Sequence, residues 1–131
     1  MKNKRLNKIF KQLKQNDESV EALDYNGEEA IYWEGSMDNK FIGTFSGILE
    51  CVKAEIKSIV CGYSFSNEAI SDNFLTDWDI DYSINCLQTM QTLVKMYREY
   101  KDNDEDVDSF IIELVISNID GTMNVKLYEN V

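Results

Sequence analysis

Two runs near the C-terminus alternate apolar and polar residues, and they constrain the fold more than any other stretch. Successive side chains of a β-strand point to opposite faces, so each run would gather its apolar side chains on one face. A turn-forming segment, Asn-Ile-Asp-Gly at residues 118–121, separates the runs and predicts an antiparallel hairpin. The apolar face would consist of Phe110, Ile112, Leu114, Ile116, Met123, Val125 and Leu127, and the solvent face of Glu113, Ser117, Asn124 and Lys126.

A second hairpin is predicted from the sequence VEALDYNGEEAIYWEG, residues 20–35. Its centre, Asn26-Gly27, is a dipeptide that tolerates the positive φ angles of a tight hairpin turn. Ile31 and Trp33 alternate with their neighbours in the returning strand. Residues 41–45 would add a third strand after a polar turn, so we expect an antiparallel sheet of about five strands.

Four segments carry apolar residues at helical spacing: residues 3–15, 46–61, 66–75 and 83–100. The first is basic and amphipathic, which suits either a membrane surface or packing on its own domain. It has only four apolar residues and no Trp, which favours packing. The predicted buried side of the second helix is Leu49, Val52, Ile56, Ile59 and Val60, and that of the last helix is Ile84, Leu87, Met90, Val94 and Tyr97.

The order of these elements predicts an α+β fold, with the helices packed on one face of the sheet. A chain of 131 residues suits one domain, residues 1–131, with a single core. The three cysteines, Cys51, Cys61 and Cys86, contain no Cys-x-x-Cys pair and are expected to be reduced thiols. Since no run of about 18 apolar residues exists, we expect no membrane span and a cytoplasmic protein.

The sequence contains no histidine, which removes most familiar catalytic groups. Ser-His-Asp and Cys-His nucleophiles and His-ligated zinc are impossible within one chain. Pairs of carboxylates remain, but with 24 acidic residues their spacing carries no information. We therefore expect no enzymatic activity, no metal and no cofactor.

Residues 77–88, DWDIDYSINCLQ, begin with alternating carboxylates, as an EF-hand calcium loop does. Tyr82 stands where that loop requires glycine, and Gln88 where it requires a bidentate glutamate. A second window, residues 102–113, carries Val107 at the turn position. The residues instead predict that Asp79 and Asp81 precede a helix capped by Asp81 or Ser83, with Trp78 and Ile80 packed inward.

Charge is the bulk property that points to a function. Six of the 13 basic residues precede the first acid, Asp17, so the rest of the chain carries seven basic and 24 acidic residues. Such a surface repels nucleic acid and anionic membranes and attracts basic proteins. Aromatic residues beside acidic clusters suit an interface with a basic partner, and the sequence offers Trp78, Tyr82, Tyr97 and Tyr100, with Trp33 and Tyr32 on the first hairpin. The candidate partner-binding residues are Asp72, Asp77, Trp78, Asp79, Asp81, Tyr82, Asp102, Asp104, Glu105, Asp106 and Asp108.

In size, acidity, α+β pattern and lack of catalytic groups, the chain resembles the immunity proteins of bacterial polymorphic-toxin and contact-dependent inhibition systems. The resemblance implies a protein that binds a cognate toxin domain, often a basic nuclease, and blocks it. It assigns a role to no single residue. Two alternatives stay open: a nucleic-acid mimic that inhibits a host nuclease, and an intracellular adaptor without inhibitory role. The sequence leaves the oligomeric state open.

Overall fold

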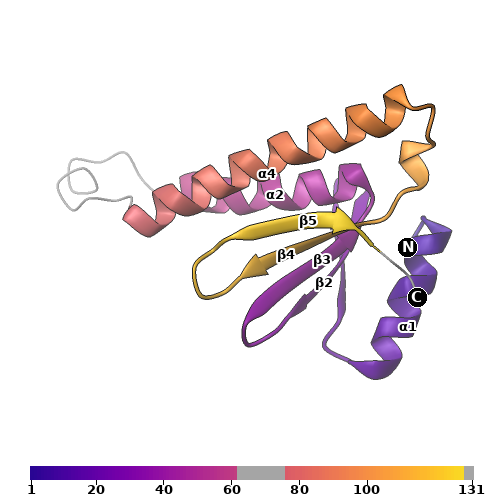
Figure 1. Ribbon diagram of the computed structural model, residues 1–131. Helices are drawn as coiled ribbons and strands as arrows, with labels where there is room; N and C mark the ends of the chain where they lie inside the picture. The colour runs from indigo at the N-terminus through magenta and orange to yellow at the C-terminus, as the bar shows by residue number, and fades with distance from the viewer. Residues whose placement is uncertain (62–75, 129–131) are drawn as a thin grey trace.

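A five-stranded antiparallel sheet forms the centre of the protein (Figure 1). The structure is a computed structural model that describes residues 1–61 and 76–128. The predicted helix at residues 66–75, together with Asp72, lies outside the described residues. The elements are α1 (Lys4–Asn16), β1 (Glu21–Tyr25), β2 (Glu28–Glu34), β3 (Asp38–Gly43), α2 (Phe45–Cys61), α4 (Asp77–Asp102), the 3₁₀ turn η1 (Val107–Ser109), β4 (Ile112–Ser117) and β5 (Met123–Leu127).

The strands lie in sequence order, β1-β2-β3-β4-β5, and each neighbouring pair is antiparallel. Both predicted hairpins are present, so the predicted α+β class and five-stranded sheet are confirmed. In the first turn, Asn26 has a φ of 56° and Gly27 a φ of 92°, the positive values that a tight hairpin turn requires. The hairpins are joined by β3 and β4, where Phe41 pairs with Leu114.

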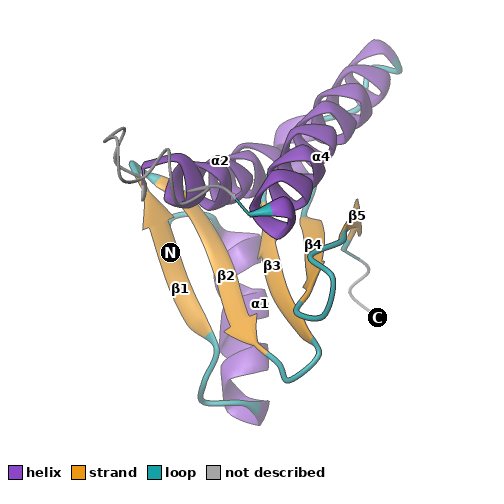
Figure 2. Cartoon of the chain, turned by 90° about the vertical axis from the view of Figure 1, so that its left-hand side faces the viewer, coloured by secondary structure: helices purple, strands orange, loops and turns teal. Residues whose placement is uncertain are grey.

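Helices α2 and α4 cover one face of the sheet, whereas α1 packs against the opposite face (Figure 2). The prediction of helices on one face therefore holds for α2 and α4 only. The reason lies in β2 and β3, which are apolar on both faces. Tyr32 and Phe41 point toward α2 and α4, while the paired Ile31 and Ile42 point toward α1.

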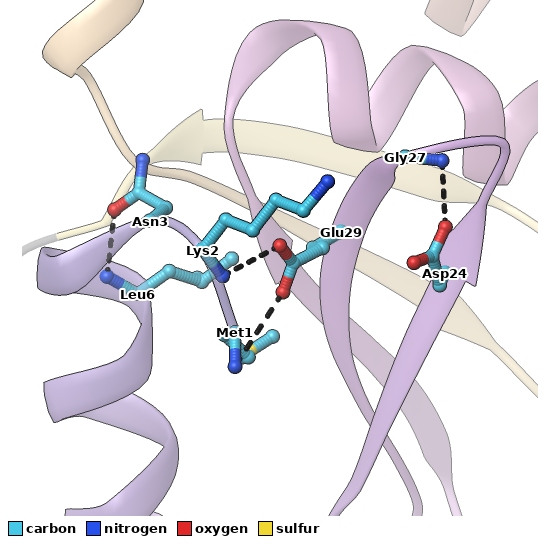
Figure 3. A network of polar contacts seen from close by, with 7 residues as sticks. All are labelled: Met1, Lys2, Asn3, Leu6, Asp24, Gly27 and Glu29. Carbon is cyan, nitrogen blue, oxygen red and sulfur yellow. Dashed lines mark hydrogen bonds and ion pairs between the residues drawn. The ribbon is translucent and has the colours of Figure 1, made fainter.

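Short contacts hold the start of α1 on the sheet (Figure 3). The side chain of Asn3 caps the helix by accepting the Leu6 N–H at 2.9 Å. The backbone N–H of Lys2 donates to Glu29 Oε1 on β2 at 2.7 Å, and the Met1 amino nitrogen lies 3.9 Å from Oε2. With Leu6 fully buried, this basic helix belongs to the core of its own domain.

The third strand ends at Gly43, earlier than predicted, and Phe45 begins α2. Thr44 explains this boundary, because its side chain accepts the Gly47 N–H at 3.1 Å and its carbonyl accepts the Ile48 N–H at 2.9 Å. A threonine oxygen at this position satisfies backbone donors that a helix start otherwise leaves unpaired. Phe45 consequently turns into the core beside Tyr97.

Helix α4 begins at Asp77, six residues before the predicted start at Ser83. Its cap is Thr76, not Asp81 or Ser83. The Thr76 hydroxyl accepts the Asp79 N–H, and the Asp79 carboxylate accepts the Thr76 N–H, each at 3.1 Å. This reciprocal capping box places Trp78 and Ile80 on the helix surface, where they are 50% and 45% exposed. The prediction that both pack inward was wrong.

The predicted buried side of α4 was also largely wrong. Met90 and Tyr97 pack against the core, but Ile84, Leu87 and Val94 are exposed. The residues that face the core are instead Tyr82, Cys86, Thr89 and Leu93. The physical reason is that α4 carries apolar residues on two opposite sides, and helical periodicity alone does not say which side meets the sheet.

The described cysteines behave as predicted: Cys51 and Cys86 are free thiols buried in the core. Within residues 1–61 and 76–128, no helix combines the length and apolar character needed to cross a membrane.

Candidate functional site

The candidate partner-binding residues fall into two groups at opposite ends of α4. Asp77, Trp78, Asp79, Asp81 and Tyr82 lie in its first two turns. The other group, Asp102, Asp104, Glu105, Asp106 and Asp108, lies at or after its last residue. A helix of 26 residues spans ~38 Å at about 1.5 Å per residue, so the two groups do not form one surface.

Around the first group, two aromatic rings stack over the turn between β4 and β5. The rings of Trp78 and Tyr82 are 4.8 Å apart and inclined by only 11°. They lie against Gly121, where an added Cβ would come within 2.8 Å of the Tyr82 ring and 3.4 Å of the Trp78 ring. Asn85 donates to the Gly121 carbonyl at 3.0 Å and fixes the turn to the helix. Tyr82 is buried, whereas half of Trp78 stays open to solvent.

Beneath these rings lies Glu55 of α2, a residue that sequence analysis missed. The Tyr82 hydroxyl donates to Glu55 Oε2 at 2.7 Å. The second carboxylate oxygen, Oε1, accepts no hydrogen bond from a described residue. Burial, followed by the hydrogen bond to Glu55, raises the pKa of Tyr82, so the phenol stays protonated and continues to donate.

Glu55 also lines an open hollow of about 380 Å³. Its walls come from β3, α2, α4 and the end of β4, and include Asn39, Glu55, Ser58, Trp78, Tyr82 and Asn118. Asn118 donates to Asn39 Oδ1 at 3.1 Å and to the Gly35 carbonyl at 3.0 Å, which holds that wall in place. A carboxylate beside aromatic faces is the chemistry that receives a lysine or arginine side chain.

The acidic residues of the first group differ in their roles. Asp79 belongs to the capping box and helps to start α4. Asp77 and Asp81 are exposed and add negative potential at the same end of the molecule. As all twelve residues of the window 77–88 lie within a continuous helix, their carboxylates cannot wrap around an ion as a calcium loop does.

The second group does not form a comparable site. Its acidic residues are exposed, and Asp104 has a φ of 60°, which ends the helix. The neighbouring Tyr97 and Tyr100 were expected to supply aromatic contacts to a partner. They pack against Phe45 instead. Acidic side chains without an exposed aromatic anchor contribute long-range attraction and little specific contact.

Trp33 and Tyr32, the aromatic residues of the first hairpin, have structural positions. Trp33 packs against the α1 side of the sheet, with the Lys40 ammonium 5.9 Å from its ring centre. The Tyr32 ring packs at a tilt against Phe41, with the ring centres 4.7 Å apart, and its hydroxyl donates to Glu34 at 2.7 Å. Of the aromatic residues that the sequence suggested, Trp78 alone combines high exposure with an acidic hollow.

Comparison with known proteins adds no relative: no family model matches the chain, no curated protein matches it significantly, and neither does any solved structure. Among the described residues, no group of three or more potential metal ligands comes together.

Proposed function

We propose that the protein is a non-enzymatic binding protein that neutralises a basic protein partner, in the manner of the immunity proteins that block toxin domains. The observation that carries the proposal is the arrangement of Trp78, Tyr82 and Glu55. A half-exposed tryptophan is stacked on a buried tyrosine, and the same hollow is lined by a glutamate whose second carboxylate oxygen accepts no hydrogen bond from a described residue.

Such an arrangement suits the centre of an interface. Trp78 is held by its stacking and by Gly121, so its ring loses little conformational freedom when a partner covers it. A lysine or arginine of the partner would enter the hollow and meet Glu55. The strongly acidic remainder of the chain, including Asp77 and Asp81 nearby, would accelerate the encounter with a basic surface.

The distribution of charge favours this function over mimicry of nucleic acid. A mimic needs carboxylates in a continuous track, about one per 3.4 Å along each strand. On α4 the acidic ends are separated by Lys95, Arg98 and Lys101, which break any such track. We place the activity in the cytoplasm, since the free thiols Cys51 and Cys86 suit a reducing compartment.

The test begins with capture of partners from an extract of the source cells, at low and at high salt. A retained basic protein is then produced and titrated calorimetrically against the wild type and the Trp78→Ala variant. We expect Trp78→Ala to weaken binding about 30-fold or more, since an anchor at the centre of an interface contributes about 2 kcal/mol or more. Trp78→Phe, which keeps an aromatic face, should lose much less.

A matched pair of charge variants separates the contribution of the Glu55 charge to binding from that of an acidic residue outside the hollow. Glu55→Gln can still accept the Tyr82 hydroxyl but no longer attracts a cation, so its binding should weaken. Asp108→Asn removes the same charge at the far end of α4 and should change affinity only slightly. Co-expression of the wild-type protein with the partner should then protect cells from the partner's toxicity. Equal affinity of wild type and Trp78→Ala would contradict the proposal, and a restriction nuclease as the partner would support mimicry instead.

A further inference from the structure

Helix α4 has a second apolar side that faces away from the sheet. Ile80, Ile84, Leu87 and Val94 lie on it and are 45%, 45%, 54% and 38% exposed. In Figure 1, α4 runs along the outer edge of the molecule, with α2 and the sheet on its inner side. Aliphatic side chains aligned along ~21 Å of one helix, at about 1.5 Å per residue, form a surface that a monomer rarely leaves uncovered.

The spacing of this stripe is that of a coiled-coil seam. Successive positions 80, 84, 87, 91, 94 and 98 are separated alternately by four and three residues, and Gln91 and Arg98 fill the remaining two. Alternating steps of three and four are the a and d positions of a heptad, which pack into the seam of another helix. Extending the pattern adds Asp77 at one end and Lys101 at the other.

Charges along this outer face are divided between its two ends. Asp77 and Asp81 lie at the N-terminal end, whereas Lys95, Arg98 and Lys101 lie at the C-terminal end, where the last helical residue, Asp102, offsets one of the three positive charges. Among the residues that the structure describes, neither Asp77 nor Asp81 forms an ion pair, and neither does Lys95 or Arg98. A helix with this distribution is complementary to itself when a second copy runs in the opposite direction.

We propose that the outer face of α4 pairs with the same face of a second copy of this chain, in an antiparallel arrangement about a two-fold axis between Leu87 and Gln91. Such an interface is isologous, since one patch meets an identical patch. In this register Ile84 meets Val94 of the second copy, and Leu87 meets Gln91. Each of these contacts occurs twice.

The same register aligns the charged ends. Asp77 faces Lys101 of the second copy, and Asp81 lies beside its Lys95. Ile80 meets Arg98, whose aliphatic stem can cover it while the guanidinium remains in water. A parallel arrangement would instead place Asp77 beside Asp77 and Lys101 beside Lys101 across the seam, so repulsion selects the antiparallel one.

The dimer face and the hollow around Glu55 lie on different sides of α4. Trp78 precedes Ile80 by two residues, which places the two side chains about 160° apart around the helix. Pairing of two copies therefore leaves the hollow open, and a dimer would present two of them.

Sedimentation equilibrium over a range of protein concentrations tests the proposal. The wild type should show a monomer–dimer equilibrium. Leu87→Glu, which places two carboxylates near the axis, should raise the dissociation constant about 100-fold or more, because unpaired charge in a seam is strongly unfavourable. Ile119→Glu, the same kind of change at a 69% exposed residue outside the seam, should leave it unchanged. Circular dichroism verifies that each variant is folded.

Charge exchange tests the direction of pairing. Asp81→Lys and Lys95→Glu should each weaken the dimer by about 10-fold, and the double variant should recover wild-type affinity, because opposite charges meet again. A monomeric wild type at every concentration would overturn the proposal. So would a dimer that Leu87→Glu leaves intact, or a double variant no better than the single ones.

Discussion

The phenol of Tyr82, on α4, donates a 2.7 Å hydrogen bond to Oε2 of Glu55, on α2, across 27 residues of sequence. This bond connects the two helices on one face of the sheet at the place where the candidate hollow opens. It thus links the packing of the fold to the geometry of the proposed binding site: the ring that supports Trp78 is held by the carboxylate that would receive a partner's cation.

Removal of this hydroxyl should destabilise the protein. Tyr82→Phe leaves a partly buried carboxylate oxygen without its donor, and hydrogen bonds to charged groups contribute about 1.5–3 kcal/mol. We expect the free energy of unfolding, measured by urea denaturation, to decrease by an amount within that range. Tyr25→Phe is the control, because the Tyr25 hydroxyl has no hydrogen-bond partner among the described residues. Equal losses in the two variants would show that the bond contributes nothing.

Gly121 should tolerate substitution less well than Gly27. Both have positive φ, 71° and 92°, so alanine at either position strains the backbone by roughly 1 kcal/mol. At Gly121 the new Cβ would also come within 2.8 Å of the Tyr82 ring, while at Gly27 nothing lies within 4 Å. Thermal unfolding should show a clearly larger loss for Gly121→Ala, together with a change in the near-ultraviolet signal of Trp78. Indistinguishable melting temperatures would mean that the contact between turn and helix is loose.

Two leucines of α4 provide a direct test of which side is buried. Leu93 is 2% exposed and Leu87 is 54% exposed. Leu93→Ala should cost about 3–5 kcal/mol, because it removes buried contacts and leaves a cavity. Leu87→Ala should change stability by about 0.5 kcal/mol or less when measured at a concentration low enough to keep the chain monomeric. The opposite order would place the aliphatic stripe against the sheet.

The buried thiols should make the protein less stable at alkaline pH. Burial, with a further contribution from the Glu55 charge, raises the pKa of Cys51 to about 12 and that of Cys86 to about 11. In the unfolded chain a thiol ionises near its ordinary pKa of 9.0. Above that pH the unfolded state releases protons that the native state retains, so the free energy of unfolding should decrease as pH rises from about 9 to 11.

The same shift in pKa predicts slow alkylation at neutral pH. Only the thiolate reacts, so Cys51 and Cys86 should resist iodoacetamide in the native protein and react after denaturation. Mass spectrometry of the digested protein separates the sites. Labelling of either cysteine in the native state at the rate of a free thiol would contradict the burial described above.

Much of the secondary structure follows from local patterns. Alternating Ile112, Leu114 and Ile116 predicted β4, and Asn26-Gly27 predicted the first turn. The first residue of α4 was harder to predict from the sequence, because several residues in the region are able to cap a helix. Thr76 prevailed since Asp79, three residues later, completes the reciprocal capping box.

The candidate site was only partly predictable. Sequence pattern identified Trp78 and Tyr82 through their acidic neighbours, and both line the hollow. It gave no signal for Glu55 or Asn118, which come from a helix interior and a turn and meet only in the folded chain. The acidic residues at 102–108 matched the same pattern, yet no exposed aromatic residue joins them, because Tyr97 and Tyr100 turn toward the core.

The sequence by itself determined the strands, the three helices of the described residues apart from their exact bounds, and the negative charge of the body. These depend on local spacing and composition, which act over a few residues. Only the tertiary structure decided that α1 covers the second face of the sheet and that α4 turns Tyr82, Cys86 and Leu93 inward. The physical reason is that β2 and α4 are apolar on both sides, so the choice of buried side depends on which surfaces pack best across the whole molecule.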